Sequence, residues 1–307
     1  MADEKMILAT DSMGGYSVHQ KLSNMVFHAA KPILKFRQFT QLKEAFGKNV
    51  GDAVLINKWT AIDTAGGALT EGTNMTYNAA TLSQVTITVT EFGNAIDYSS
   101  KLRDLSNHDV QKEIATVLAR DSAKTIDTRI EAVFNAAKIR YVGTTTAGSA
   151  LTTNGTATAT NTSVLNAFHV KEIVDYLRSN DVPTYTANDF ICIGTTKALR
   201  GLKDNSSWEN AALYGATERL FNGEVGKYYG CRFVEQNNGM DTTIGSGSTT
   251  GEAYFFGGDV CAEVLALPLE VRREVPADFG RRLAMAWYMI AQWGLVNDTY
   301  IIKWDSA

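Results

Sequence analysis

The sequence has little of what would suggest a metalloenzyme or a disulfide-stabilised protein. Its 307 residues include only three cysteines and four histidines. Cys192, Cys231 and Cys261 are odd in number, far apart and without a CxxC spacing, so they indicate neither a disulfide framework nor a zinc site. We expect three buried free thiols. The histidines are scattered without HExxH or any paired metal spacing, which argues against metal catalysis.

Long apolar runs and an excess of positive charge are also missing. No stretch reaches the roughly 20 apolar residues that a helix needs to cross a bilayer. The N-terminus lacks the basic region and apolar run of a secretory signal, so we expect folding in a cytoplasm and no membrane contact. There are 29 Lys and Arg against 33 Asp and Glu, a formal net charge of -4. A protein that grips many phosphates usually carries the opposite sign, so we expect no specific binding of nucleic acid.

Motifs that would carry catalysis are absent too. No GxSxG occurs, and no GxGxxG follows a strand and opens a helix. The segment nearest to a phosphate loop, 223–228, fails because Phe221 stands where the first glycine should be and Tyr228 where Ser or Thr is required. We therefore expect no catalytic site and no cofactor, and an enzyme with an unrecognised site is the weakest alternative.

Two β-forming segments with a glycine-rich stretch between them predict a long hairpin. Residues 53–59 are rich in strand formers, and Val85, Ile87 and Val89 alternate with threonines, as in a strand with one apolar and one polar face. An isolated two-stranded hairpin is marginally stable in water. We expect this one to lie on another surface, either of the same chain or of a neighbouring subunit.

The segments on either side of the hairpin differ in pattern. Before it, Pro32 forbids a continuous helix, which leaves an extended arm, the favoured interpretation, or a leading strand of the same domain. After it, apolar residues from Val110 recur at helical spacings behind Ser106, a suitable N-cap, as far as about Ala137. The sequence therefore predicts one helix roughly 40 Å long.

The second half predicts a mixture of helices and strands. Residues 143–163 are almost only Gly, Thr, Ala, Ser and Asn and predict an exposed connector. Beyond it we expect helices at 165–177, 196–203 and 209–221, and strands at 190–193, 228–235 and 253–256. The C-terminal part predicts a sheet, although 283–290 could be helical by propensity. The fold class is α+β.

The order of these elements resembles the major capsid proteins of tailed bacteriophages, whose Hong Kong 97-like fold is shared with encapsulins and herpesvirus shells. The resemblance covers nearly the whole chain. Asn49–Val54 is similar to the start of the family's extended loop and Thr70–Gly72 to the turn near its tip. Gly223–Glu235 and Ala253–Val260 are similar to the family's helix-to-strand passage and to the strand that leaves its axial domain. None of these motifs is specific alone; their order carries the resemblance.

The resemblance implies a division of the chain into five parts. These are an N-terminal arm (1–46), an extended hairpin loop (47–95), a peripheral domain with a spine helix at about 106–137 (96–164), an axial domain (165–256) and the closing sheet of the peripheral domain (257–307).

The function that the resemblance implies is structural. The chain would assemble with itself into hexamers, pentamers and an icosahedral shell around double-stranded DNA, with a portal and possibly scaffolding or decoration proteins as partners. It would be made in a bacterial cytoplasm and reside in the virion. The alternative of a different kind is the shell of an encapsulin-type compartment. The hairpin would contact the adjacent subunit through Trp59, Gly66, Gly67, Leu69, Glu71, Met75 and Tyr77.

Overall fold

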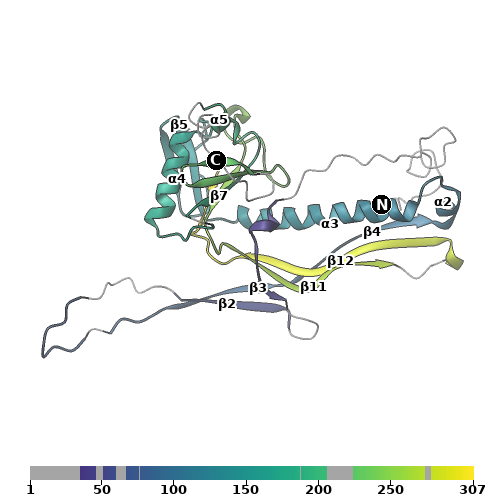
Figure 1. Cartoon of the computed structure of the whole chain (residues 1–307), viewed down its shortest axis with the longest axis horizontal. Helices are drawn as coiled ribbons and strands as arrows, with labels where there is room; N and C mark the ends of the chain where they lie inside the picture. The colour runs from purple at the N-terminus through teal and green to yellow at the C-terminus, as the bar shows by residue number, and fades with distance from the viewer. Residues whose placement is uncertain are drawn as a thin grey trace.

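The computed structural model describes residues 35–45, 51–59, 67–75, 77–186, 188–205, 224–273 and 278–307. Figure 1 shows three parts: an α/β body at one end, a long helix lying along a long sheet, and a hairpin that projects away from both. The strands form a four-stranded, a seven-stranded and a two-stranded sheet. Residues 1–34 of the expected arm (1–46), the expected helix at 209–221 and Gly66 lie outside the described residues.

The long helix is α3, Val110–Asn135, preceded by the short α2, Ser100–Leu105. Its side-chain cap is Asp109, which accepts hydrogen bonds from the backbone N–H groups of Gln111 and Lys112. The predicted helix is confirmed, but it starts later than Ser106, because Ser106 is the residue that ends α2. One face of α3 is buried, as the helical spacing predicts.

Helix α3 lies on a sheet with the strand order β1 (Gln41–Ala45), β11 (Cys261–Arg273), β12 (Arg282–Leu295), β4 (Thr90–Ser99). Along β12 every second residue is buried, including Trp287 and Trp293, which both belong to the core cluster that contains the buried face of α3. The segment that could have been helical is therefore a strand. The burial of every second side chain beneath α3 favours the strand, and it outweighs the helix propensity of the Ala, Leu and Met residues in this segment.

The body is a seven-stranded sheet buried on both faces. Its order is β6 (Gly148–Thr152), β5 (Ile139–Thr145), β13 (Ile301–Trp304), β10 (Ala253–Phe256), β7 (Phe190–Gly194), β9 (Cys231–Glu235), β8 (Glu224–Tyr228). On one face it packs against α4 (Ala167–Ser179) and α5 (Arg200–Lys203), and on the other against the C-terminal end of α3. The central strands β10 and β7 carry no charged residue because both faces of the sheet are covered.

Several expectations for this region are wrong in detail. Residues 139–152 form the hairpin β5–β6, and most of this hairpin falls in the stretch 143–163 that was expected to be a connector. A Cβ on Gly143 would lie 2.5 Å from the Trp304 ring, so glycine is needed there for close packing. The single strand expected at 228–235 is two strands joined at Tyr229 and Gly230, both with positive φ. Strand β13, expected in the closing sheet, instead pairs with β10 and β5.

The segment 35–45 packs inside its own chain and is not an arm. Phe36 is fully buried, with its ring centre 5.6 Å from that of Phe134 on α3 and 6.2 Å from that of Tyr254 on β10. After the short helical turn η1 (Arg37–Phe39), β1 pairs in parallel with β11. The alternative interpretation, a leading strand of the same domain, therefore holds for these residues. The aromatic side chains of Phe36 and Phe39 pack into a core formed by segments far away in the sequence.

Two further turns and the three thiols complete the described fold. The turns are η2 (Ser246–Ser248) and η3 (Asp278–Gly280). Cys192, Cys231 and Cys261 are buried and free, as expected. The helix expected at 196–203 is shortened to α5, because residues 196–199 form turns in which the Thr195 hydroxyl accepts from the Ala198 backbone N–H.

Candidate interaction surface

The hairpin strands β2 (Ala53–Trp59) and β3 (Leu82–Thr88) have one face anchored on the rest of the chain. Val54 pairs with Ile87 on this face, and Ile87 is only 3% exposed. Ile87 packs in a small cluster with Ala262 and Val264 of β11. A Cβ on Gly294 would lie 2.8 Å from Ile87 carbon atoms, so the close approach depends on that glycine.

The opposite face of the hairpin leaves large apolar side chains in water. Trp59 is 70% exposed and stands opposite Leu82, which is 48% exposed. Leu55 is 59% exposed on the same face, and between these positions Asn57 accepts a hydrogen bond from Gln84. Residue exposure therefore alternates along β2, with polar and apolar groups together on the outer face.

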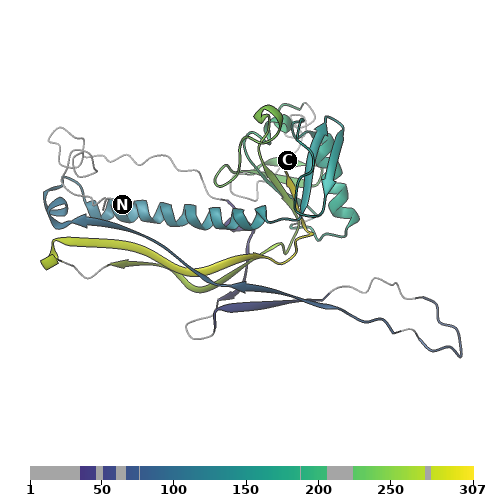
Figure 2. The same cartoon turned by 180° about the vertical axis from the view of Figure 1, so that it is seen from behind.

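The tip of the hairpin lies beyond the two strands and carries most of the predicted contact residues. Leu69, Met75 and Tyr77 are 68%, 58% and 92% exposed. A turn at 70–73 is closed by the Thr73 backbone N–H, which donates to the Thr70 carbonyl, and Gly72 adopts a positive φ there. Figures 1 and 2 show the tip far from the helix and the body. Large apolar side chains this exposed make the tip a candidate contact surface.

The structure separates the predicted contact residues into two places. Trp59 ends β2, whereas Gly67, Leu69, Glu71, Met75 and Tyr77 occupy the tip. Sequence reasoning missed Leu55 and Leu82, which share the outer face with Trp59. The alternation along 53–59 could have identified Leu55, because it has the same parity as Trp59.

Among the described residues, a serine and a histidine whose side chains meet help to fasten helix α4 to the sheet. His169 Nε2 lies 3.3 Å from Ser163 Oγ, and His169 Nδ1 lies 3.0 Å from the Tyr141 hydroxyl. Burial lowers the pKa of His169, which is fully buried. Tyr141 also donates to Glu172, so the network joins α4 to β5. Within the described residues no cluster of His, Cys, Asp and Glu is arranged to hold a metal ion.

Helix α3 meets the body through buried carboxylates. Asp127 accepts from the Phe36 backbone N–H at 2.8 Å and from Gln236 Nε2 at 2.7 Å, and Glu131 accepts from the Tyr254 hydroxyl at 2.7 Å. Burial raises the pKa of Glu131 to about 7 and also raises that of Asp127. This polar junction holds the helix, the body and the segment at 36 together.

None of the described helices is both long and apolar enough to pass through a membrane.

Comparison with known proteins identifies the family to which this chain belongs. The model of the phage capsid family matches residues 14–257, well over half of the chain. The chain belongs to the phage capsid family. It is a structural capsid protein, a component of virions whose shells are built from repeated subunits. Curated protein sequences include no match to it.

Solved capsid structures share the fold of this capsid protein across nearly its whole length. The capsid of Ralstonia phage GP4 is 15% identical, with a TM-score of 0.69 over 99% of this chain and 98% of that one. The capsid asymmetric unit of cyanophage Pam1 is 14% identical, with a TM-score of 0.69 and full coverage of both chains. The capsid of cyanophage P-SCSP1u is 14% identical, with a TM-score of 0.68 over 94% and 93%. The fold is the Hong Kong 97-like capsid fold.

Proposed function

We propose that this capsid protein assembles with copies of itself into hexamers and pentamers, and then into a closed icosahedral shell that encloses double-stranded DNA without specific binding. The observation that carries the proposal is the exposed outer face and tip of the hairpin. Leu69 is 68% exposed and Tyr77 is 92% exposed. Burying such side chains in a contact removes apolar area from water, at about 25 cal/mol per Å².

The parts of the subunit take separate roles in this proposal. Helix α3 with the four-stranded sheet forms the peripheral domain, and the seven-stranded body, to which β5, β6 and β13 also belong, forms the axial domain at the capsomer centre. The hairpin lies on the neighbouring subunit. A portal, and a scaffolding or decoration protein, act during assembly in the bacterial cytoplasm. The subunit's role is structural and non-catalytic.

Sedimentation of the purified protein, combined with electron microscopy, tests the assembly. We expect capsomers or closed particles under conditions that favour association. A protein that stays monomeric at every salt and protein concentration would defeat the proposal. Particles that contain an enzyme and no nuclease-protected DNA would favour an encapsulin-type compartment instead.

Deletion of residues 60–75 separates the hairpin's role from folding. Because its tip contacts little of its own chain, we expect the shortened subunit to keep the circular dichroism and cooperative unfolding of the intact one. Assembly should be lost in the same sedimentation experiment. Failure of the shortened subunit to fold would place the hairpin tip in the subunit's own core.

A further inference from the structure

A short loop of the body lies across α3 and covers its buried acids. The loop is 236–241, which follows β9, and we call it the strap. At one end Gln236 Nε2 donates to the Asp127 carboxylate of α3 at 2.7 Å. At the other end the Asp241 backbone N–H donates to Glu252 Oε2 at 2.9 Å. The strap is therefore held down by carboxylates at both ends.

The middle of the strap seals Glu131 of α3 from water. Gly239 has a φ of 81°, and a Cβ at this position would lie 3.4 Å from side-chain atoms of Glu131. The next residue, Met240, belongs to the core cluster that contains the buried face of α3. Glu131 is only 5% exposed. Glycine takes this left-handed conformation without strain, which lets the strap lie directly on the acid.

The cations nearest to Glu131 are engaged by other acids. The ionisable groups around it are Asp127 of α3, Tyr254 of β10, Lys303 of β13, Arg140 of β5 and, next to β10 and β13, Glu252 and Asp305. Lys303 Nζ lies 2.5 Å from Glu252 Oε1. Arg140 Nη1 lies 3.1 Å from Asp305 Oδ2. Among the described residues, no Lys or Arg forms an ion pair with Glu131.

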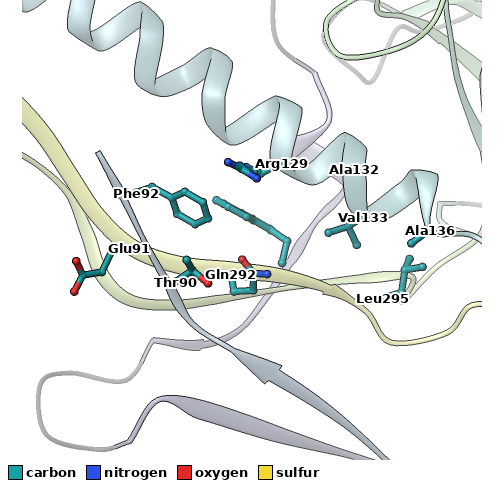
Figure 3. Close-up of a pocket in the computed structure, with 10 residues that line it drawn as sticks. Thr90, Glu91, Phe92, Arg129, Ala132, Val133, Ala136, Gln292 and Leu295 are labelled. Carbon is teal, nitrogen blue, oxygen red and sulfur yellow. The ribbon is translucent and has the colours of Figure 1, made fainter. Parts of the chain in front are cut away.

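The other side of α3 supplies neither a cation nor water to Glu131. A pocket of about 460 Å³ opens there toward β4 and β12 (Figure 3), and α3 lines it through Arg129, Ala132, Val133 and Ala136. Glu131 does not line this pocket. The Arg129 guanidinium lies over the Phe92 ring, 5.3 Å from its centre. Hydration of Glu131 therefore requires the strap to move.

The closed strap favours the protonated form of Glu131. Burial, and after it the neighbouring Glu252 carboxylate, raise the pKa of Glu131 from 4.5 to about 7, against the hydrogen bond from Tyr254 and the charge of Lys303. With the strap open the acid is hydrated and regains its ordinary pKa. The closed form is therefore favoured most below pH 4.5, and this advantage is lost as pH rises through about 7.

We propose that the strap at 236–241 is a proton-controlled cover, which stays closed on α3 while Glu131 carries a proton and opens to water when the proton leaves. Opening breaks the hydrogen bonds at the two ends of the strap and leaves the aromatic core between α3 and the body in place. The open form presents the carboxylates of Asp127 and Glu131 to solvent. The device belongs to a single subunit and does not depend on self-assembly.

Hydrogen exchange of the full chain, followed by mass spectrometry, measures the opening. A peptide that spans 236–241 contains the Asp241 N–H, which opening releases from Glu252. After correction for the intrinsic pH dependence of exchange, its protection should fall on the order of tenfold to a hundredfold from pH 5 to pH 8. The buried strand β7 should stay protected at both values. Constant protection of the strap, or exchange of the strap and β7 at equal rates, would overturn the proposal.

Glu131→Gln removes the titrating group and keeps an acceptor for the Tyr254 hydroxyl. We expect the strap of this variant to be as well protected at pH 8 as at pH 5. The matched control is Asp175→Asn on the exposed side of α4, which should keep the pH dependence of the parent chain. A pH dependence in Glu131→Gln equal to that of the parent would show that another group controls the strap.

Two further variants keep the test decisive if Glu131→Gln folds poorly. Glu252→Gln removes the neighbouring acid and frees Lys303 to neutralise Glu131, so the loss of protection with pH should become smaller. Gly239→Ala strains the left-handed position and should lower the protection of the strap several-fold at both pH values alike. An unchanged pH dependence in Glu252→Gln, or full protection in Gly239→Ala, would contradict the proposal.

Discussion

The hairpin and the junction between α3 and the body use opposite arrangements of side chains. The hairpin holds Trp59 and Tyr77 in water, whereas the junction buries the carboxylates of Asp127 and Glu131. Exposed apolar groups cost the isolated subunit little and stabilise a complex when they are covered. Buried acids that accept several hydrogen bonds fix the geometry of the elements that donate them. The junction therefore fixes the helix and the body relative to each other, whereas the projecting hairpin leaves apolar side chains exposed to water.

The largest effect on stability should come from opening a cavity in the junction between α3 and the body. Phe134 is fully buried, with its ring centre 5.0 Å from that of Phe256 and 5.6 Å from that of Phe36. Phe134→Ala should lower the free energy of unfolding by about 3–5 kcal/mol in denaturant titrations. Val117→Ala, at a position of the same helix that is 37% exposed, should change it far less. Equal effects would mean that the junction is not the stable part of the subunit.

The second prediction concerns the pH dependence of the free energy of unfolding, to which the buried Glu131 should contribute. The pKa of Glu131 is raised from 4.5 to about 7, so the folded chain binds more protons than the unfolded one between these values. The free energy of unfolding should therefore fall as pH rises through this window, by at most about 3 kcal/mol from Glu131. The stabilisation is complete below pH 4.5 and lost above about pH 7.

Glu131→Gln isolates this contribution because glutamine does not titrate but can still accept from the Tyr254 hydroxyl. The difference in unfolding free energy between the two proteins, measured from pH 4.5 to 8, should favour the variant increasingly as pH rises. The neighbours Glu252, Lys303 and Asp127 are present in both proteins. A difference that stays constant with pH would show that Glu131 does not titrate in this range.

The smallest expected effect is on the stability of the isolated subunit after a hairpin change. Tyr77→Ser should alter the free energy of unfolding by less than about 0.5 kcal/mol, because Tyr77 is 92% exposed. The same variant should assemble poorly, since its aromatic ring would otherwise be covered by a second copy. A large loss of stability in the monomer would place Tyr77 in an intramolecular contact and remove the contrast with Phe134.

Periodicity predicted the elements whose burial repeats regularly. Val110, Ile114 and Leu118 identified α3 because a helix with one buried face repeats its apolar residues every three or four positions. Alternation around Val85 and Ile87 identified β3 for the equivalent reason. The exposed residues of the candidate surface were predicted as a group, through the glycine-rich tip and the resemblance.

Elements stabilised by distant partners could not be predicted in this way. Phe36 and the chain around it resembled an arm because nothing nearby covers them, yet they pack between α3 and β10. The glycines and threonines of β5 and β6 resembled a connector because their sequence shows no apolar period. Trp304 covers Gly143 only after β13 has joined the sheet.

The sequence by itself determined the local elements, the free thiols and the two strands of the hairpin, since these follow from spacing and composition. Only the tertiary structure decided which strands share a sheet, where the segment at 36 lies and that a pocket opens beside Arg129. Those features depend on contacts between residues far apart in the chain, and such contacts leave no periodic signal. Local alternation predicted the strands of the hairpin, while the structure alone shows that one face packs on β11 and that the other face is exposed.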